Sequence, residues 1–350
     1  MAHGDLGRED HRSLGEQFRG HFTPEADHLY AVLLRQLADD LDAGGITANL
    51  LQDRLSAPRS DVVHLRLLAG IFRIVLRGDA PRLVPFYPAL GGTADPAEAW
   101  PHVEPILRCH ADELRASLDI APQTNEPGRA ACLAVGLTEA VREHGIRRIR
   151  LLEPGASAGL NLNVDRYRIV GPGWAWGDPG SPLVFDVDLS NTSEHATIVE
   201  RRGCDLHPVD ATTPDGADYL TSFVWPFHLA RHDRLAAALD VLRRHPVTID
   251  RAGASEWLAA QLAEPRPDVL TVVWQSITEQ YWPAAESVAV QHIVAHARDR
   301  MPLAHVSLEG VPPPIGPAGY DVVAHGAELR VDGRLIGHST HHGPPIVLPG

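Results

Sequence analysis

A short turn that carries an acid and two glycines is the part of this sequence best suited to bind a ligand. The segment IRLLEPGASAGLNL (149–162) reads as a strand, Glu153, a turn from Gly155 to Gly159, and the start of an apolar helix. Ligand-binding turns of open α/β sheets lie at the carboxyl ends of strands. Glycine there permits positive φ and close backbone approach, and a helix start offers N–H groups. We therefore interpret this segment as the ligand-binding turn of a Rossmann-like domain.

Three kinds of site are compatible with this turn. In a site for S-adenosylmethionine (SAM), Glu153 would lie near the methionine amino group, and an acid suits a ligand that carries ammonium and sulfonium charges. In a serine hydrolase, residues 155–159 form G-x-S-x-G, with Ser157 as nucleophile and a histidine such as His342 in the triad. In a dinucleotide fold, the turn lacks one glycine of G-x-G-x-x-G, and Glu153 would lie beside the phosphates.

The order of elements favours the first of these three sites. Several strands precede the nucleophile elbow of a hydrolase, whereas mostly helical sequence precedes Ser157 here. An acid beside a pyrophosphate is electrostatically unfavourable, which argues against the dinucleotide. A glycine turn that binds no ligand is the remaining alternative.

Polar residues also follow the later predicted strands. Asp205 follows the second strand, where an acid commonly binds the ribose hydroxyls of a nucleotide, although an aspartate here can equally cap a turn. Asp250 and Ala252 follow the third strand, where small side chains and backbone amides can contact an adenine edge. The fourth strand ends in polar and aromatic candidates for substrate contact or catalysis, with the glutamate a potential general base. These candidates are Gln275, Ser276, Glu279 and Tyr281.

Four segments as a set resemble an actinobacterial family known only as a domain of unknown function. They are LLEPGASAGLNLNVDRYRI, GCDLHPVDATTP, TSFVWP and VVWQSITEQYWP, and the resemblance covers roughly residues 20–345. The family supplies no established reaction. The arrangement around the sheet is similar to class I SAM-dependent methyltransferases, with serine at 157 where those enzymes commonly have glycine. The resemblance to the methyltransferases implies SAM as cofactor and a small molecule as methyl acceptor.

A further stretch, QTNEPGR (123–129), resembles another part of the same family. Its polar groups would cover the cofactor, or Thr124 or Asn125 would cap the helix that follows. The expected cofactor-binding residues are therefore Glu153, Gly155, Ala156, Ser157, Gly159, Asn161, Asp205, Asp250, Ala252, Asn125 and Arg129.

The elements that must position these residues fall into two regions. Residues 1–144 predict helices, at 24–42, 60–76 with Ser60 as cap, 97–118 and 127–143. Residues 145–350 predict strands at 146–152, 196–201, 247–249, 269–274 and 303–308, alternating with helices at 231–244, 255–262 and 284–300. This alternation indicates a mostly parallel sheet with flanking helices. We also expect a C-terminal antiparallel hairpin that turns at 331–334, and an inserted hairpin near 164–190 that could act as a lid.

Composition excludes several classes of protein. All 31 basic residues are arginine, so a P-loop lysine, a Schiff base and a Ser-Lys dyad are excluded. The net charge of −14 argues against nucleic-acid binding. No membrane-length apolar run and no secretory signal are visible, and three scattered cysteines suggest free thiols in a reducing cytoplasm.

Twenty histidines raise the question of a metal site. His228 and His232, and likewise His292 and His296, have i,i+4 spacing, but both pairs lack the glutamate of H-E-x-x-H, and we expect no metal. A cluster at 338–342 contains three histidines. It can line the mouth of the site or form a solvated tail, and its terminal position favours the tail.

Overall fold

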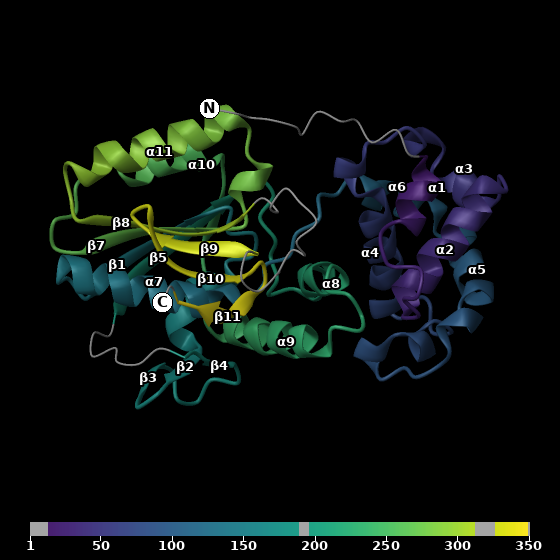
Figure 1. The fold of residues 1–350 in the computed structure, drawn as a ribbon, viewed down its shortest axis with the longest axis horizontal. Helices are drawn as coiled ribbons and strands as arrows, with labels where there is room; N and C mark the ends of the chain where they lie inside the picture. The colour runs from purple at the N-terminus through teal and green to yellow at the C-terminus, as the bar shows by residue number, and fades with distance from the viewer. Residues whose placement is uncertain (1–12, 189–195, 312–325, 349–350) are drawn as a thin grey trace. The chain divides into compact units, whose positions relative to one another are not determined.

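The chain forms two compact units in the structure, which is a computed structural model that describes residues 13–188, 196–311 and 326–348 (Figure 1). The first unit comprises Met1–Thr124 and Asp218–His232. The second comprises Asn125–Ala217 and Asp233–Gly350, and it contains every residue expected above to bind a cofactor or a substrate.

The first unit is helical, as its apolar periodicity predicts. Its longest helices are α2 (Leu29–Asp42) and α4 (Val63–Leu76), whose leucines and isoleucines at helical spacing are buried in one core. The other helices are α1 (Leu14–Arg19), α3 (Ile46–Leu50), α5 (Trp100–Cys109), α6 (Ala111–Leu118), η1 (Gln52–Arg54), η2 (Arg59–Asp61), η3 (Val84–Phe86), η4 (Pro88–Leu90) and η5 (Pro96–Glu98).

Two details of this unit differ from the sequence prediction. Ser60 lies inside η2 and does not cap α4, which begins after Val62 in a left-handed conformation. The helix predicted over 97–118 is two helices, because the backbone leaves the helical region at His110 (φ −112°, ψ 25°).

The second unit contains an eight-stranded sheet in the order β11-β10-β9-β8-β7-β1-β5-β6. Five strands are parallel: β1 (Arg148–Pro154), β5 (Thr197–Asp205), β6 (Ile249–Arg251), β7 (Leu270–Ser276) and β8 (Leu303–Gly310). Counted in chain order, their arrangement is 3-2-1-4-5, the order of a Rossmann-like sheet. The predicted α/β class is confirmed.

Helices cover both faces of this sheet. Figure 1 shows α10 (Ala254–Gln261) and α11 (Ala284–Arg298) on one face and α7 (Arg129–His144) on the other. Sequence analysis placed the segment of α7 in the N-terminal helical region, but α7 packs against β7, β8 and β9 of the sheet. The second unit also contains η6 (Leu160–Arg166) and η7 (Glu279–Tyr281), whereas α8 (Pro214–Ser222) and α9 (Leu229–Arg244) each have residues in both units.

The C-terminal segment adds three antiparallel strands to the sheet. They are β9 (Ala327–Val331), β10 (Arg334–Thr340) and β11 (Gly343–Val347). The predicted hairpin turn is confirmed, since Asp332 (φ 51°) and Gly333 (φ 80°) have the positive φ of a two-residue hairpin turn. The solvated histidine tail is wrong, because residues 338–342 form strand β10 and its turn into β11.

The insertion after the glycine turn forms a small sheet of its own, in the order β3-β2-β4. Its strands are β2 (Arg168–Gly171), β3 (Trp174–Gly177) and β4 (Val184–Asp186). β2 and β3 form an antiparallel hairpin, β4 runs parallel to β2, and β3 contacts η6. Its role as a lid stays a prediction.

Candidate functional site

The carboxyl ends of the five parallel strands meet at one edge of the sheet. The chain order reverses between β1 and β7, because β5 and β6 extend the sheet on one side of β1 while β7 and β8 extend it on the other. Ligands of open α/β sheets bind in the crevice outside such a switch point. Glu153 at the end of β1 and Gln275 and Ser276 at the end of β7 flank this position.

Glu153 is a buried acid whose environment disfavours its charge. The residue is 2% exposed, and burial raises its pKa to about 8. The Arg129 guanidinium, the Trp274 indole and the Asn161 amide favour the ionised form but do not outweigh burial. Although Asn161 lies beside Glu153, neither Glu153 Oε2 nor the two polar atoms of the Asn161 side chain make a hydrogen bond of good geometry within the described part of the chain. Buried polar atoms of this kind usually have partners, so they are suited to bind a polar ligand.

The QTNEPGR segment is brought to this position, while the expectation that its polar groups cover a cofactor stays a prediction. Arg129 is 6% exposed and donates to the carbonyl oxygens of His341 (Nε, 2.9 Å) and Ser276 (Nη1, 3.1 Å). Asn125 Oδ1 accepts from Leu160 N, the first amide of η6 after the glycine turn, at 2.8 Å. The capping of α7 by Thr124 or Asn125 is therefore wrong, since α7 has no side-chain cap.

The amides of the glycine turn donate mainly to other protein atoms. Gly155 N and Ala156 N both donate to the Cys204 carbonyl, at 2.8 and 2.9 Å. Ser157 N donates to Asp205 Oδ2 at 2.9 Å, and Asp205 Oδ1 accepts from His207 N at 2.8 Å. Because these amides are engaged, they do not form the cradle of N–H groups that a pyrophosphate requires.

The two glycines of the turn are needed for packing as well as for conformation. Both have positive φ, 75° at Gly155 and 73° at Gly159. A Cβ on Gly155 would lie 2.3 Å from Thr278 Oγ1, and one on Gly159 would lie 2.6 Å from a methyl group of Val247. The loop after β7 therefore lies directly against the turn after β1.

The loop after β7 is fastened by an acid that sequence analysis did not select. Glu309, near the end of β8, accepts from Thr278 N (3.2 Å), Glu279 N (3.3 Å) and Gln275 Nε2 (3.3 Å). Burial raises its pKa to about 7. Gln275 Oε1 is 3.0 Å from His305 Nε2, which extends the network along β8. An acid at the carboxyl end of a predicted strand was the available signal for Glu309, as it was for Glu153.

Some predicted residues are not brought into this cluster. The Asp250 carboxylate accepts from Arg202 Nη2 (2.8 Å) and Trp257 Nε1 (2.7 Å), and Ala252 N donates to the Asp205 carbonyl. Both therefore take part in contacts between β5, β6 and α10. Tyr281 is 73% exposed on η7, and its part in substrate binding stays a prediction.

Histidine and cysteine side chains give no metal site in the part of the chain that is described. No group of three or more His, Cys, Asp or Glu side chains there could hold a metal ion. Cys109, Cys132 and Cys204 are free thiols, as their number and spacing suggested.

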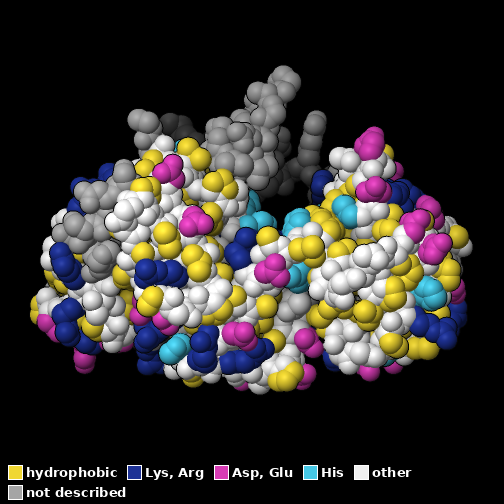
Figure 2. All heavy atoms as spheres, turned by 90° about the horizontal axis from the view of Figure 1, so that it is seen from below, with side chains coloured by type: hydrophobic (Ala, Val, Ile, Leu, Met, Phe, Trp, Pro, Cys, Tyr) yellow, Lys and Arg dark blue, Asp and Glu magenta, His cyan; other side chains and the backbone are white. Residues whose placement is uncertain are grey.

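The surface carries charges of both signs. Arginine and acidic side chains are interspersed over the described part of the face in Figure 2. No described helix combines the length and apolar character that crossing a bilayer requires.

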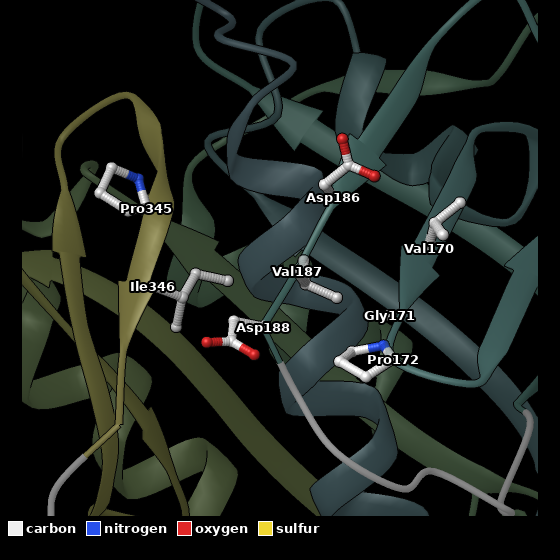
Figure 3. Close-up of a pocket in the computed structure, with 8 residues that line it drawn as sticks. All are labelled: Val170, Gly171, Pro172, Asp186, Val187, Asp188, Pro345 and Ile346. Atoms are coloured by element: carbon white, nitrogen blue, oxygen red, sulfur yellow. The ribbon is translucent and has the colours of Figure 1, made fainter.

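A separate pocket of about 420 Å³ lies between the small sheet and β11 (Figure 3). Val187 and Ile346 both line it, and Asp186 and Asp188 lie along β4 and its extension. The residues that line it include none of the predicted site residues.

Fold and site together define a Rossmann-like α/β protein with a buried, polar switch-point cluster. The chain belongs to a bacterial family described as "Uncharacterized protein conserved in bacteria" (DUF2332), which matches residues 17–347. The expected extent of the family is therefore confirmed, while its restriction to actinobacteria stays a prediction. No curated protein matches the chain.

Proposed function

We propose that this protein binds SAM at the carboxyl ends of β1, β5 and β7 and transfers its methyl group to a small molecule. The observation that carries the proposal is the pair of buried side chains at the switch point, Glu153 and Asn161, which lie close enough for the Asn161 amide to favour the ionised carboxyl, while three of their polar atoms lack a hydrogen bond of good geometry to any described residue. A carboxyl and an amide suit the ammonium and carboxylate of an amino acid moiety. SAM would supply the electrophilic methyl group.

Asp205 supports the adenosyl end of the same proposal. It ends β5, the neighbour of β1 in the sheet, and two amides occupy two of its acceptor positions. A carboxylate has about four such positions, so ribose hydroxyls could still donate to it. Methyl transfer then depends chiefly on alignment of the acceptor and exclusion of water, which the loop after β7 would supply through Gln275, Ser276, Glu279 and Tyr281.

A calorimetric titration with SAM, and with its demethylated product, tests the proposal. We expect binding of both, and Asn161→Leu should abolish it while leaving the thermal unfolding midpoint nearly unchanged or raised, because the substitution removes unsatisfied buried polar atoms. Absence of binding to the wild-type protein would contradict the proposal and favour a non-catalytic protein.

The serine hydrolase remains as a second candidate because of one observation. Ser157 has φ 55°, and a positive φ at the central serine of G-x-S-x-G is the strained conformation expected of a nucleophile elbow. A fluorophosphonate probe should label Ser157 if this candidate is correct, with Ser157→Ala as control. Labelling of the wild type alone would replace the methyltransferase proposal.

A further inference from the structure

We propose that the loop at 276–282, fastened by Glu309, is a gate that closes the switch-point crevice and must move before a ligand reaches Glu153 and Asn161. The identity of the ligand rests on the proposed function, but the gate does not. Three features of the loop carry the inference: its contact with the glycine turn, its fastening, and its backbone conformation.

The gate closes the crevice through Thr278. Its Oγ1 lies 2.3 Å from the position that a Cβ on Gly155 would take, and its methyl group lies 3.4 Å from it. A ligand that approaches the backbone of the turn on this side must displace Thr278. Glu153 and Asn161 are 2% and 0% exposed in this arrangement, so a ligand cannot reach either side chain from solvent.

The loop is held at each of its first four residues. Arg129 of α7 donates to the Ser276 carbonyl, and the Leu308 carbonyl accepts from Ile277 N at 2.8 Å. The Glu309 carboxylate accepts from the next two amides, those of Thr278 and Glu279. Glu309 is the side chain to remove, because it holds two of these four residues from outside the loop, whereas Arg129 holds one and also lies beside Glu153.

The conformation of the loop favours movement once it is released. Ile277 has φ 48°, and for a β-branched residue this left-handed conformation is strained. Such strain persists where surrounding contacts enforce it and is relieved when they are lost. The segment is therefore held closed against a conformational preference to open.

Carboxyl labelling tests the gate without any ligand. Wild-type protein is treated with a water-soluble carbodiimide and glycine ethyl ester, and modification of Glu153 is measured by mass spectrometry relative to exposed Glu264. Glu309→Ala should raise labelling of Glu153 at least fivefold, whereas Glu143→Ala, which removes a carboxylate on the far end of α7, should not. Equal labelling in the wild type and in folded Glu309→Ala would overturn the gate.

Thr278→Ala is a second variant that leaves every contact of Glu309 in place, because those contacts go to the amides of Thr278 and Glu279 and to the Gln275 side chain. It removes the side chain above Gly155 and should also expose Glu153, with Thr138→Ala on α7 as the matched control. Amide exchange at 278 and 279 should rise about tenfold in Glu309→Ala but not in Thr278→Ala. Unchanged labelling of Glu153 in Thr278→Ala would contradict the closing role of Thr278.

Titration with SAM distinguishes an error in the gate proposal from an error in the proposed cofactor. Both gate variants should bind SAM at least threefold more tightly than the wild type and Thr138→Ala. If no variant binds SAM but Glu153 labelling rises, the gate stands and the proposed cofactor fails. If the wild type binds SAM and neither labelling nor affinity changes in the variants, the gate fails and the cofactor stands.

Discussion

At the scale of single residues, Glu153 couples ligand binding to proton release. Burial raises its pKa to about 8, so in the ligand-free protein at pH 7 the carboxyl is mostly protonated. A bound cation favours the ionised form, so binding must expel the proton. Proton release on ligand binding distinguishes an acid that contacts a bound cation from one that is merely buried.

We therefore predict that SAM affinity rises by nearly tenfold per pH unit between pH 6 and 7.5. Calorimetry in two buffers of different ionisation enthalpy should report release of close to one proton per ligand at pH 7. Glu153→Gln should bind more weakly and release none. Proton release that persists in this variant would assign the linkage to another group.

Asp205 has a structural role that can be measured apart from any ligand. Its two carboxylate oxygens accept from Ser157 N and His207 N, which joins the turn after β1 to the end of β5. We predict that Asp205→Ala lowers the free energy of unfolding by about 1–3 kcal/mol and Asp205→Asn by less, since one acceptor remains. Urea denaturation measures both, and equal loss in the two variants would argue against the hydrogen bonds as the cause.

Several of these residues could be predicted from the sequence, and others could not. Glu153, Asn161 and Arg129 lie in segments whose residue types already indicated a ligand. Glu309 and Thr278 act through contacts with residues far from them in the sequence or across the sheet edge. Such contacts depend on strand order, which a single sequence does not reveal.

At the scale of elements, the glycine turn and the loop after β7 form one packed unit. Periodicity predicted the strands that carry them, because buried parallel strands read as apolar runs. Periodicity did not predict that position 155 requires glycine because Thr278 packs against it. A glycine that contacts a ligand and a glycine that contacts a side chain cannot be distinguished in a sequence.

A double-mutant cycle tests this packing. Gly155→Ala should lower the free energy of unfolding by about 2–3 kcal/mol, from its positive φ and from collision with Thr278. In a Thr278→Ala background we expect the cost to fall by about 1 kcal/mol. Gly145→Ala is the matched control, because Gly145 has φ 68° and nothing within 4 Å of its Cβ position. Its cost should be the same with or without Thr278.

At the scale of the whole molecule, the two units differ in which buried groups have shifted pKa values. Burial lowers the pKa values of His21, His28 and His64 in the first unit, that of His64 to about 3. In the second unit burial raises the pKa values of Glu153 and Glu309, to about 8 and 7. Burial lowers the pKa of His305 in the second unit to about 4. At acid pH this shift opposes part of the pH dependence of stability that the two glutamates produce.

These shifts predict that the order in which the units unfold depends on pH. The unfolded first unit binds more protons than the folded one below pH 6.5, so its stability should fall as the pH drops from 6.5 to 5. Above pH 4.5 the folded second unit binds more protons than the unfolded one, because the pKa values of Glu153 and Glu309 are raised. Its stability should therefore fall as the pH rises toward 8. Differential scanning calorimetry from pH 5 to 8.5 should therefore show two transitions, one that moves to lower temperature as the pH drops below 6.5 and one that moves to lower temperature as the pH rises toward 8. His64→Gln should flatten the acid dependence of the first unit and Glu153→Gln the alkaline dependence of the second, and a single transition with neither effect would contradict this division.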